Sequence, residues 1–315
     1  MDKEKIKVII DTDPGVDDIT ALSFAFVEER LDIKLITISY GNLDVYTETR
    51  NACHLLDIFN KDIPLVTGYP KRYSDSLENA IFLHGKDGTG KYIPPKETVH
   101  KPIKKDVADA MYEVLLENPH EITMVILGPH TNFARLLIRH PDAKDLIKDV
   151  LMMGASPNGI KVDPNHKSFN IRTDPNAFKH TVDAKFQIVL CPSRIGRDTT
   201  HFTFKQVNQI AKMNDVGKML SLTYQTYWEP HYKDKRIANC DLSTLYYLLY
   251  PEIYKTETAT IDVDVDKNPG KVTAKFDKNG NAKFIMKVNR KKFMKIVFNQ
   301  IHKFDGITIE NLKKQ

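Results

Sequence analysis

Residues 6–18, IKVIIDTDPGVDD, join an apolar run to a dense group of acids and set the frame for the rest of the chain. Ile6–Ile10 is predicted to be a buried strand, and four carboxylates follow it within eight residues. Packing four like charges at a strand end is costly unless a positive charge lies among them. A hard cation that takes oxygen ligands, such as calcium, is the obvious candidate. The plainer interpretation is a turn at Pro14-Gly15 with Asp caps on a helix that starts near Asp17, which accounts for only one or two acids.

Strand and helix patterns alternate through the first two thirds of the chain. The expected buried strands are Ile6–Ile10, Ile33–Ser39, Ile63–Val66, Ile122–Leu127, Val150–Met153 and Phe186–Leu190. Amphipathic helices are expected from about Asp17, over Thr47–Phe59 and from Thr131. This alternation predicts an α/β fold with a doubly wound, mostly parallel sheet. Ligands of such folds bind outside the carboxyl ends of the strands, and the polar motifs of this chain follow predicted strands.

The last third of the chain has a different pattern. Residues 205–250 are predicted to be helical, and a closing helix is expected near Arg290–His302. Between them, Thr258–Val265, Val272–Phe276 and Phe284–Val288 are predicted to be short strands. No internal repeat, low-complexity segment or convincing linker divides the sequence, so residues 1–315 are expected to form a single domain.

Composition is that of an ordinary soluble globular protein, with 41% hydrophobic and 28% charged residues. The net charge of +5 comes from dispersed Lys residues, without an Arg-rich arm or basic–aromatic alternation, so no nucleic-acid partner is expected. The three Cys residues form no paired framework, which suits a reducing compartment. No signal peptide or membrane-length apolar stretch is seen, and a cytoplasmic location without membrane contact is predicted.

The acidic run, together with later motifs, resembles the nucleoside hydrolase family, the inosine–uridine-preferring N-ribohydrolases. DTDPGVDD at 11–18 matches the signature of that family fully. Supporting matches follow in the family's order: Gly41-Asn42, His84-Gly85, Gly128-Pro-His-Thr-Asn132, Met152-Met153-Gly154, Phe169-Asn170 with Asp174-Pro175, and Asp241. The resemblance covers roughly residues 6–250. It implies hydrolysis of the N-glycosidic bond of a ribonucleoside by a cytoplasmic salvage enzyme, a small-molecule substrate, and a homodimer or homotetramer.

The resemblance also implies a calcium ion at the carboxyl edge of the sheet. Its ligands would be Asp13, Asp18, Asp241 and the backbone carbonyl of Leu127. Such scattered carboxylate and carbonyl oxygens suit the loose coordination of calcium. Asp13 would also be the catalytic general base that activates a water. Further substrate contacts would come from Asp17, Asn42 and Asn170 on the ribose, with His84 and Met153 beside the substrate and Asp11 supporting the acids from behind.

The group that faces the leaving base departs from the pattern of many family members. Cys240 stands where many members have a His, and a thiol is a weak donor and a poor substitute acid. Cys240 is either a base contact of a different subgroup or a small buried hydrophobe at a helix start. His84 and Trp228 are the remaining candidates to face the base, and simple helix packing is an equally good interpretation of Trp228.

A second departure concerns the substrate's 5′ end. Ser168 stands where the family has a Glu that binds the ribose 5′-hydroxyl, and His166 and Lys167 precede it. Replacing a carboxylate with basic neighbours, including Arg172, would suit a 5′-phosphate. The alternative substrate is therefore a nucleoside 5′-monophosphate, with a modified purine such as a deazaguanine as one base. The competing interpretation is a solvated surface Lys in a drifting loop.

Two further possibilities concern the activity itself. Residues 85–91, GKDGTGK, match the core of a phosphate-binding P-loop, but Tyr92 replaces the required Ser or Thr and Pro94-Pro95 cannot begin the required helix. This segment is predicted to be a lid over the nucleoside site. A catalytically weakened nucleoside-binding protein also stays open, although the predicted calcium ligands and general base are intact.

Overall fold

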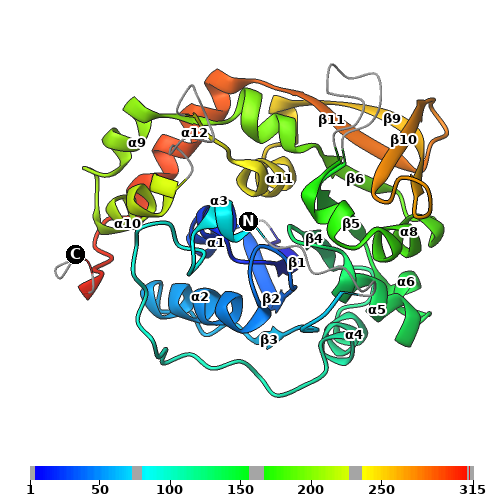
Figure 1. Ribbon diagram of the computed structural model, residues 1–315, viewed down its shortest axis with the longest axis horizontal. Coiled ribbons are helices and arrows are strands. Elements are labelled where there is room, and N and C mark those ends of the chain that lie inside the picture. The colour runs from blue at the N-terminus through cyan, green and yellow to red at the C-terminus, as the bar shows by residue number, and fades with distance from the viewer. Residues whose placement is uncertain (1–3, 73–79, 156–166, 227–235, 311, 313–315) are drawn as a thin grey trace.

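A single nine-stranded sheet forms the centre of the molecule (Figure 1). The computed structural model describes residues 4–72, 80–155, 167–226, 236–310 and 312. The strand order is β10-β9-β11-β6-β5-β4-β1-β2-β3. The strands are β1 (Ile6–Thr12), β2 (Leu31–Ile38), β3 (Leu65–Thr67), β4 (Thr123–Ile126), β5 (Asp149–Met153), β6 (Ile188–Cys191), β9 (Tyr254–Asp264), β10 (Lys271–Phe276) and β11 (Ala282–Val288). All neighbouring strands from β11 to β3 pair in parallel, which confirms the predicted fold class.

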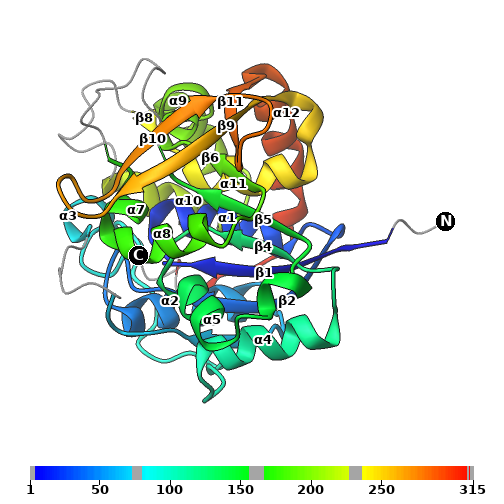
Figure 2. The ribbon, with the colours of Figure 1, turned by 90° about the vertical axis from the view of Figure 1, so that its right-hand side faces the viewer.

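Helices cover both faces of this sheet (Figures 1 and 2). They are α1 (Val16–Phe26), α2 (Val45–Ile58), α3 (Ile81–His84), α4 (Val107–Glu117), α5 (Thr131–Arg139), α6 (Ala143–Leu146), α7 (Phe169–Thr173), α8 (Pro175–Asp183), α9 (Phe204–Ile210), α10 (Asp215–Thr223), α11 (Cys240–Leu249) and α12 (Arg290–Ile301). A π-helical turn, η1 (Ile195–Thr199), follows β6. Short 3-10 turns are η2 (Tyr224–Thr226), η3 (Pro251–Ile253) and η4 (His302–Phe304). No helix in the described ranges has both the length and the apolar character needed to cross a bilayer.

The apolar run of β1 is buried on both faces of the sheet. Val8 and Ile10 point into the core beneath α1, α2 and α11, whereas Ile9 points into the core beneath α4, α5 and α8. Because side chains alternate along a strand, one uninterrupted run of hydrophobic residues feeds both cores. The strand is therefore held at the centre of the sheet, and the acids that follow it emerge at the carboxyl edge.

The structure departs from the sequence expectations in two places, and it shows where the three late strands, which were predicted, lie. α1 is buried over its whole length, because α10 and α11 cover the face that amphipathic patterning leaves open. A two-stranded pairing of β7 (Phe202–Thr203) with β8 (Arg236–Ile237) lies within and beside the region predicted to be helical. The late strands extend the central sheet, with β11 parallel to β6 and β9 antiparallel to β11.

As the sequence predicted, residues 85–91 are not a phosphate-binding P-loop. They follow the short helix α3 rather than a strand, and the next helix after them is α4. The segment packs on α10, where Lys91 N donates to Leu222 O at 3.1 Å. A Cβ at Gly90 would lie 2.0 Å from Thr223 O, so this close approach of two backbones requires glycine.

Candidate active site

A cavity of about 490 Å³ opens at the carboxyl edge of the parallel strands. It falls within the size range of small-molecule sites. Most of the residues predicted for the site line it, namely Asp13, Asp17, Asp18, Asn42, His84, Leu127, Met153, Lys167, Ser168, Asn170, Cys240 and Asp241. His166 and Trp228 lie outside the described residues. The parallel sheet thus gathers side chains from distant segments at one place.

Asp18 ties the end of β1 to the start of α1. Its Oδ1 accepts from Thr12 Oγ1 at 2.5 Å and from Asp13 N at 3.3 Å, and its Oδ2 accepts from Gly15 N at 3.2 Å. The residue at the N-cap of α1 is Gly15, which has no side chain to accept a hydrogen bond, and the Asp18 carboxylate three residues later accepts from its backbone N–H. The plainer interpretation of the acidic run therefore holds for Asp18, which caps the helix while it also lines the cavity.

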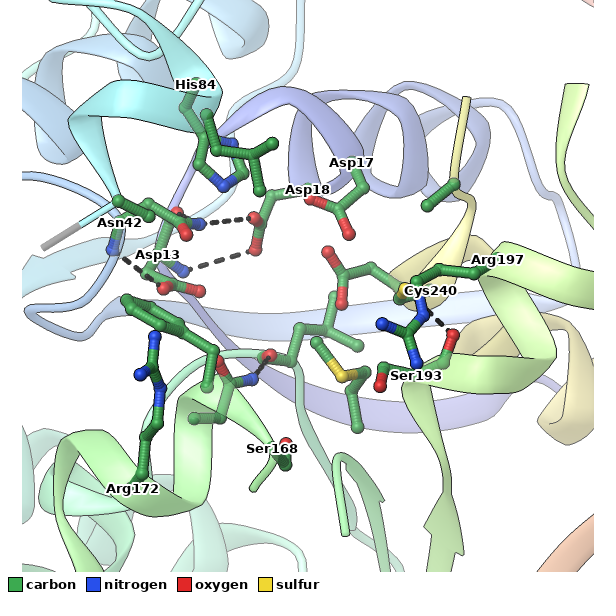
Figure 3. A pocket seen from close by; sticks show the side chains of 18 of the residues that line it. Asp13, Asp17, Asp18, Asn42, His84, Ser168, Arg172, Ser193, Arg197 and Cys240 are labelled. Carbon is green, nitrogen blue, oxygen red and sulfur yellow. Dashed lines mark hydrogen bonds between the residues drawn. The ribbon is translucent and has the colours of Figure 1, made fainter. Parts of the chain in front are cut away.

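Asp13 is held by the loop that follows β2. Its Oδ2 accepts from Asn42 N at 3.0 Å, and Asn42 Nδ2 donates to Asp13 O at 2.8 Å (Figure 3). Glycines allow this approach: a Cβ at Gly41 would lie 2.0 Å from Asp13 Oδ2, and one at Gly128 would lie 2.7 Å from Asp13 Oδ1. The carboxylate is thus clamped between the ends of three adjacent strands.

Asp241, on the first turn of α11, completes the group of acids. Asp17, Asp18 and Asp241 each offer an oxygen, and these atoms all lie within 4.8 Å of one another. Burial, followed by the charge of Asp17, raises the pKa of Asp241 well above its usual range. Burial raises the pKa of Asp18 to about 7, and burial followed by repulsion from Asp18 raises the pKa of Asp13. Four buried carboxyl groups facing one cavity require either protons or a cation.

The donor set of this cavity fits a hard cation. Asp241 Oδ1 is fully buried and has no hydrogen-bond partner among the described residues. The Leu127 carbonyl also faces the cavity, where it accepts from Asn170 Nδ2. Carboxylate and carbonyl oxygens are the ligands that calcium takes. The three acids whose oxygens lie within 4.8 Å of one another include Asp17, whereas the predicted set of calcium ligands includes Asp13 and not Asp17.

Asp11 lies behind this group, at the end of β1. Its Oδ1 accepts from Thr37 Oγ1 at 2.6 Å and from Asn132 Nδ2 at 2.8 Å. Burial raises the pKa of Asp11 to about 7. Asn132 also donates to Ile38 O at 3.0 Å, so Asp11 connects β1, β2 and the start of α5 beneath the cavity floor.

His84 is fixed at the start of α1 and is neutral. Its Nδ1 accepts from Val16 N at 2.9 Å, which places the ring proton on Nε2. Burial lowers the pKa of His84 to about 3. The ring therefore contributes a neutral N–H to the cavity wall. It is not a cationic acid at neutral pH.

The wall near the predicted 5′ end carries Ser168, Lys167 and Arg172. Ser168 is buried, and a Cβ at Gly154 would lie 3.0 Å from its Oγ. The Arg172 guanidinium lies 5.3 Å from the ring centre of Phe169. This side of the cavity has cationic side chains and no carboxylate among the described residues that line it. Phosphate binding there stays a prediction.

The opposite wall contains residues that the sequence patterns did not single out. Ser193 and Arg197 come from the segment after β6 and lie beside Cys240 (Figure 3). Cys240 Sγ donates to Ser193 O at 3.5 Å, and burial raises the pKa of this thiol well above its usual range. The only signal for these residues in the sequence was their position: residues 192–198 come soon after a predicted parallel strand and include one Gly and two Arg.

Comparisons with known proteins agree with this fold. A family model described as inosine-uridine preferring nucleoside hydrolase matches residues 8–295. The non-specific ribonucleoside hydrolase RihC of Salmonella paratyphi A is 32% identical over 262 residues, covering 82% of this chain and 84% of that protein. The structure of a plant nucleoside hydrolase, the PpNRh1 enzyme, superposes with a TM-score of 0.86 at 26% identity, covering 94% of this chain and 98% of that one. A purine-preferring ribonucleoside hydrolase from Gardnerella vaginalis shares the fold, with a TM-score of 0.84 at 22% identity over 94% and 98% of the two chains.

Proposed function

This chain belongs to the inosine-uridine preferring nucleoside hydrolase family and is a ribonucleoside hydrolase, and we propose that it works with a bound calcium ion and with Asp13 as general base. The observation that carries the proposal is the convergence of Asp13, Asp17, Asp18 and Asp241 on one cavity at the sheet edge. Three of these acids offer oxygens within 4.8 Å of one another. A site of this charge needs a cation before a neutral sugar can enter.

In this proposal the ion is held by Asp13, Asp18, Asp241 and the Leu127 carbonyl. Once bound, calcium would make a water easier to deprotonate and would orient the ribose hydroxyls. Asp17 belongs to the same group of acids, so its carboxylate lies within reach of both the ion and the ribose 2′-hydroxyl in this proposal. Asn42 and Asn170 supply amide groups at the cavity wall for further ribose oxygens.

Asp13 takes the proton of the attacking water. Its Oδ2 is fixed by Asn42 N, which holds the carboxylate at a constant orientation and leaves Oδ1 on the Gly128 side. The water oxygen bonds to the anomeric carbon as the C–N bond breaks, through a transition state with positive charge on the ribose. The neighbouring carboxylates stabilise that charge electrostatically, as they do in other glycosidases.

We propose that the substrates are ribonucleosides. The relatives are ribonucleoside hydrolases, and they do not favour a 5′-monophosphate substrate or a weakened binding protein. The single domain, the cytoplasmic location and a homodimer or homotetramer stay predictions that accompany this function.

Chelation and one pair of variants test the metal and the base. Removing divalent ions should abolish hydrolysis of inosine and uridine and lower the melting temperature, because the ion offsets carboxylate repulsion, and added Ca²⁺ should restore both. Asp13→Asn should lower kcat by about three orders of magnitude or more, since the general base is lost and an anionic calcium ligand becomes a neutral one. Asp145→Asn, which changes an exposed carboxylate on α6, is the matched control. Full activity after verified metal removal, or near-normal turnover by Asp13→Asn, would refute the mechanism.

A further inference from the structure

Arg197 is positioned in the cavity by an unusual backbone turn. It belongs to η1, a single π-helical turn directly after β6, and such turns occur frequently at functional sites. The turn is fixed from both sides: a Cβ at Gly196 would lie 2.6 Å from Cys240 Sγ, and Asn239 Nδ2 donates to Thr200 O at 2.8 Å. The backbone that carries Arg197 is therefore packed against the first turn of α11.

The guanidinium group of Arg197 makes no hydrogen bond or ion pair within the described part of the chain, although its charge acts on the neighbouring Cys240 thiol. Its Nε is buried and makes no hydrogen bond there. The Nε of Arg194 is unpaired as well, but the terminal nitrogens of two nearby arginines have protein acceptors: Arg194 Nη2 donates to Met286 O at 3.1 Å, and Arg290 Nη1 donates to His201 O at 2.8 Å. An unsatisfied buried donor is costly, more so on a charged group. A charged donor that faces a ligand cavity without a partner is therefore available for the ligand.

The place of Arg197 in the cavity indicates which part of the ligand it meets. Figure 3 shows Arg197, Cys240 and Ser193 together on one side and Ser168 with Arg172 on another. This inference rests on the proposed function, in which the acids hold the ribose, and on the place of the ribose 5′ end at Ser168 that the family resemblance implies. The base then extends toward Cys240 and Arg197. The Cys240 thiol already donates to Ser193 O, which leaves the guanidinium as the charged donor on this wall.

We propose that Arg197 binds the leaving base and stabilises the negative charge that the base acquires as the C–N bond breaks. The electron pair of that bond moves to the base nitrogen, and the base departs as an anion. The water oxygen bonds to the anomeric carbon, and its proton goes to Asp13. The released base later takes a proton from solvent, so the overall products are ribose and the neutral base. Arg197 acts by charge and hydrogen bonding and transfers no proton.

The geometry of a guanidinium also selects the class of base. Its planar fork of N–H donors matches two adjacent acceptors, such as the O6 and N7 atoms of a 6-oxopurine. Adenine presents an amino donor beside N7, so one arm of the fork would face a donor. Arg197 therefore favours nucleosides of 6-oxopurines, such as inosine, over adenosine.

Leaving-group dependence separates this role from a structural one. Wild type, Arg197→Met and Arg197→Lys are assayed with calcium on inosine, on adenosine and on p-nitrophenyl riboside, whose leaving group is a stable anion. Arg197→Met should lower kcat/KM for inosine by about 100-fold or more, as loss of a charge-stabilising donor does. For p-nitrophenyl riboside the loss should stay below about fivefold, because that leaving group needs little stabilisation. The preference for inosine over adenosine should narrow, and Arg197→Lys should lie between the other two enzymes.

A control variant and the pattern of losses distinguish failure of the proposed Arg197 role from failure of the proposed function. Lys205→Met, an exposed change of the same charge on α9, should match wild type on all substrates. Equal losses of Arg197→Met on inosine and on p-nitrophenyl riboside, or no loss on either, would overturn the role of Arg197 while hydrolysis by wild type leaves the proposed function intact. Failure of wild type to cleave any of the three ribosides would instead refute the proposed function.

Discussion

His130 is the buried group through which we expect acid to destabilise this fold. It precedes α5, is fully buried and packs on Phe178 with ring centroids 4.8 Å apart. Neither ring nitrogen has a hydrogen-bond partner among the described residues. Burial lowers the pKa of His130 from 6.5 to about 3. The folded protein therefore keeps this imidazole neutral at pH values where the unfolded chain protonates it.

The sign and size of the effect follow from that pKa shift. Between pH 6.5 and about pH 3 the unfolded state binds more protons, so the free energy of unfolding falls as the pH falls. Each pH unit inside this window is worth about 1.4 kcal/mol, which gives about 2 kcal/mol between pH 6.5 and pH 5. The loss begins near the unfolded pKa and stops below the folded one.

Two variants and urea unfolding at pH 7 and pH 5 isolate this contribution. Because His130→Leu and His130→Asn cannot titrate, the stability of each relative to wild type should rise by about 2 kcal/mol at the lower pH. His130→Leu should also be more stable than wild type at pH 7 by about 1–3 kcal/mol, since it removes two unsatisfied polar atoms, whereas His130→Asn keeps a polar group there. The carboxyl groups of the cavity are common to all three proteins and cancel. A stability difference that is the same at both pH values would refute the reasoning.

Two further predictions concern the cavity. Gly41→Ala should reduce turnover severely without unfolding the protein, because its Cβ would lie 2.0 Å from Asp13 Oδ2; normal steady-state kinetics would contradict the placement of Asp13. Cys240→Ala should lower kcat by less than about tenfold, the equivalent of one weak hydrogen bond, since its thiol donates to Ser193 O. A loss as large as that of Asp13→Asn would instead make the thiol a catalytic group.

Local patterns were sufficient to predict the fold class and the edge of the sheet where the cavity lies, whereas most of the individual cavity residues were predicted from the family resemblance. The run Ile6–Ile10 has no polar interruption except Lys7, and β1 covers it with a two-residue extension to Thr12. Motifs that follow parallel strands reach the same edge by topology alone, so the strand pattern was enough to bring Asp13, Asn42 and Leu127 together. Whether each has its predicted role is a question of chemistry and stays with the proposed tests.

Arg197 and α1 show what the sequence patterns could not provide. A π turn has no periodic signature, so the direction of Arg197 depends on how Gly196 packs against Cys240, a contact between residues 44 positions apart (240 − 196). Similarly, α1 has the acids and caps of an exposed helix start, yet α11 covers its outer face. Both outcomes arise from tertiary packing of distant elements, which overrides local patterning.

The distribution of charge in the cavity follows the chemistry of the bond that is broken. Cleavage of a C–N glycosidic bond separates charge, positive on the ribose and negative on the base. The buried carboxylates Asp13, Asp17, Asp18 and Asp241 lie where the ribose is proposed to bind, and Arg197 lies on the wall proposed to face the base. Charges held by a protein wall at partial burial act more strongly than charges in bulk solvent. Both charges are needed in this proposal, because the acids without a cation repel one another and an anionic base without Arg197 would meet no charged donor on the wall proposed to face it. The two ends of the cavity therefore stabilise opposite halves of the same transition state, which is why loss of Arg197 should depend on the leaving group and loss of Asp13 should not.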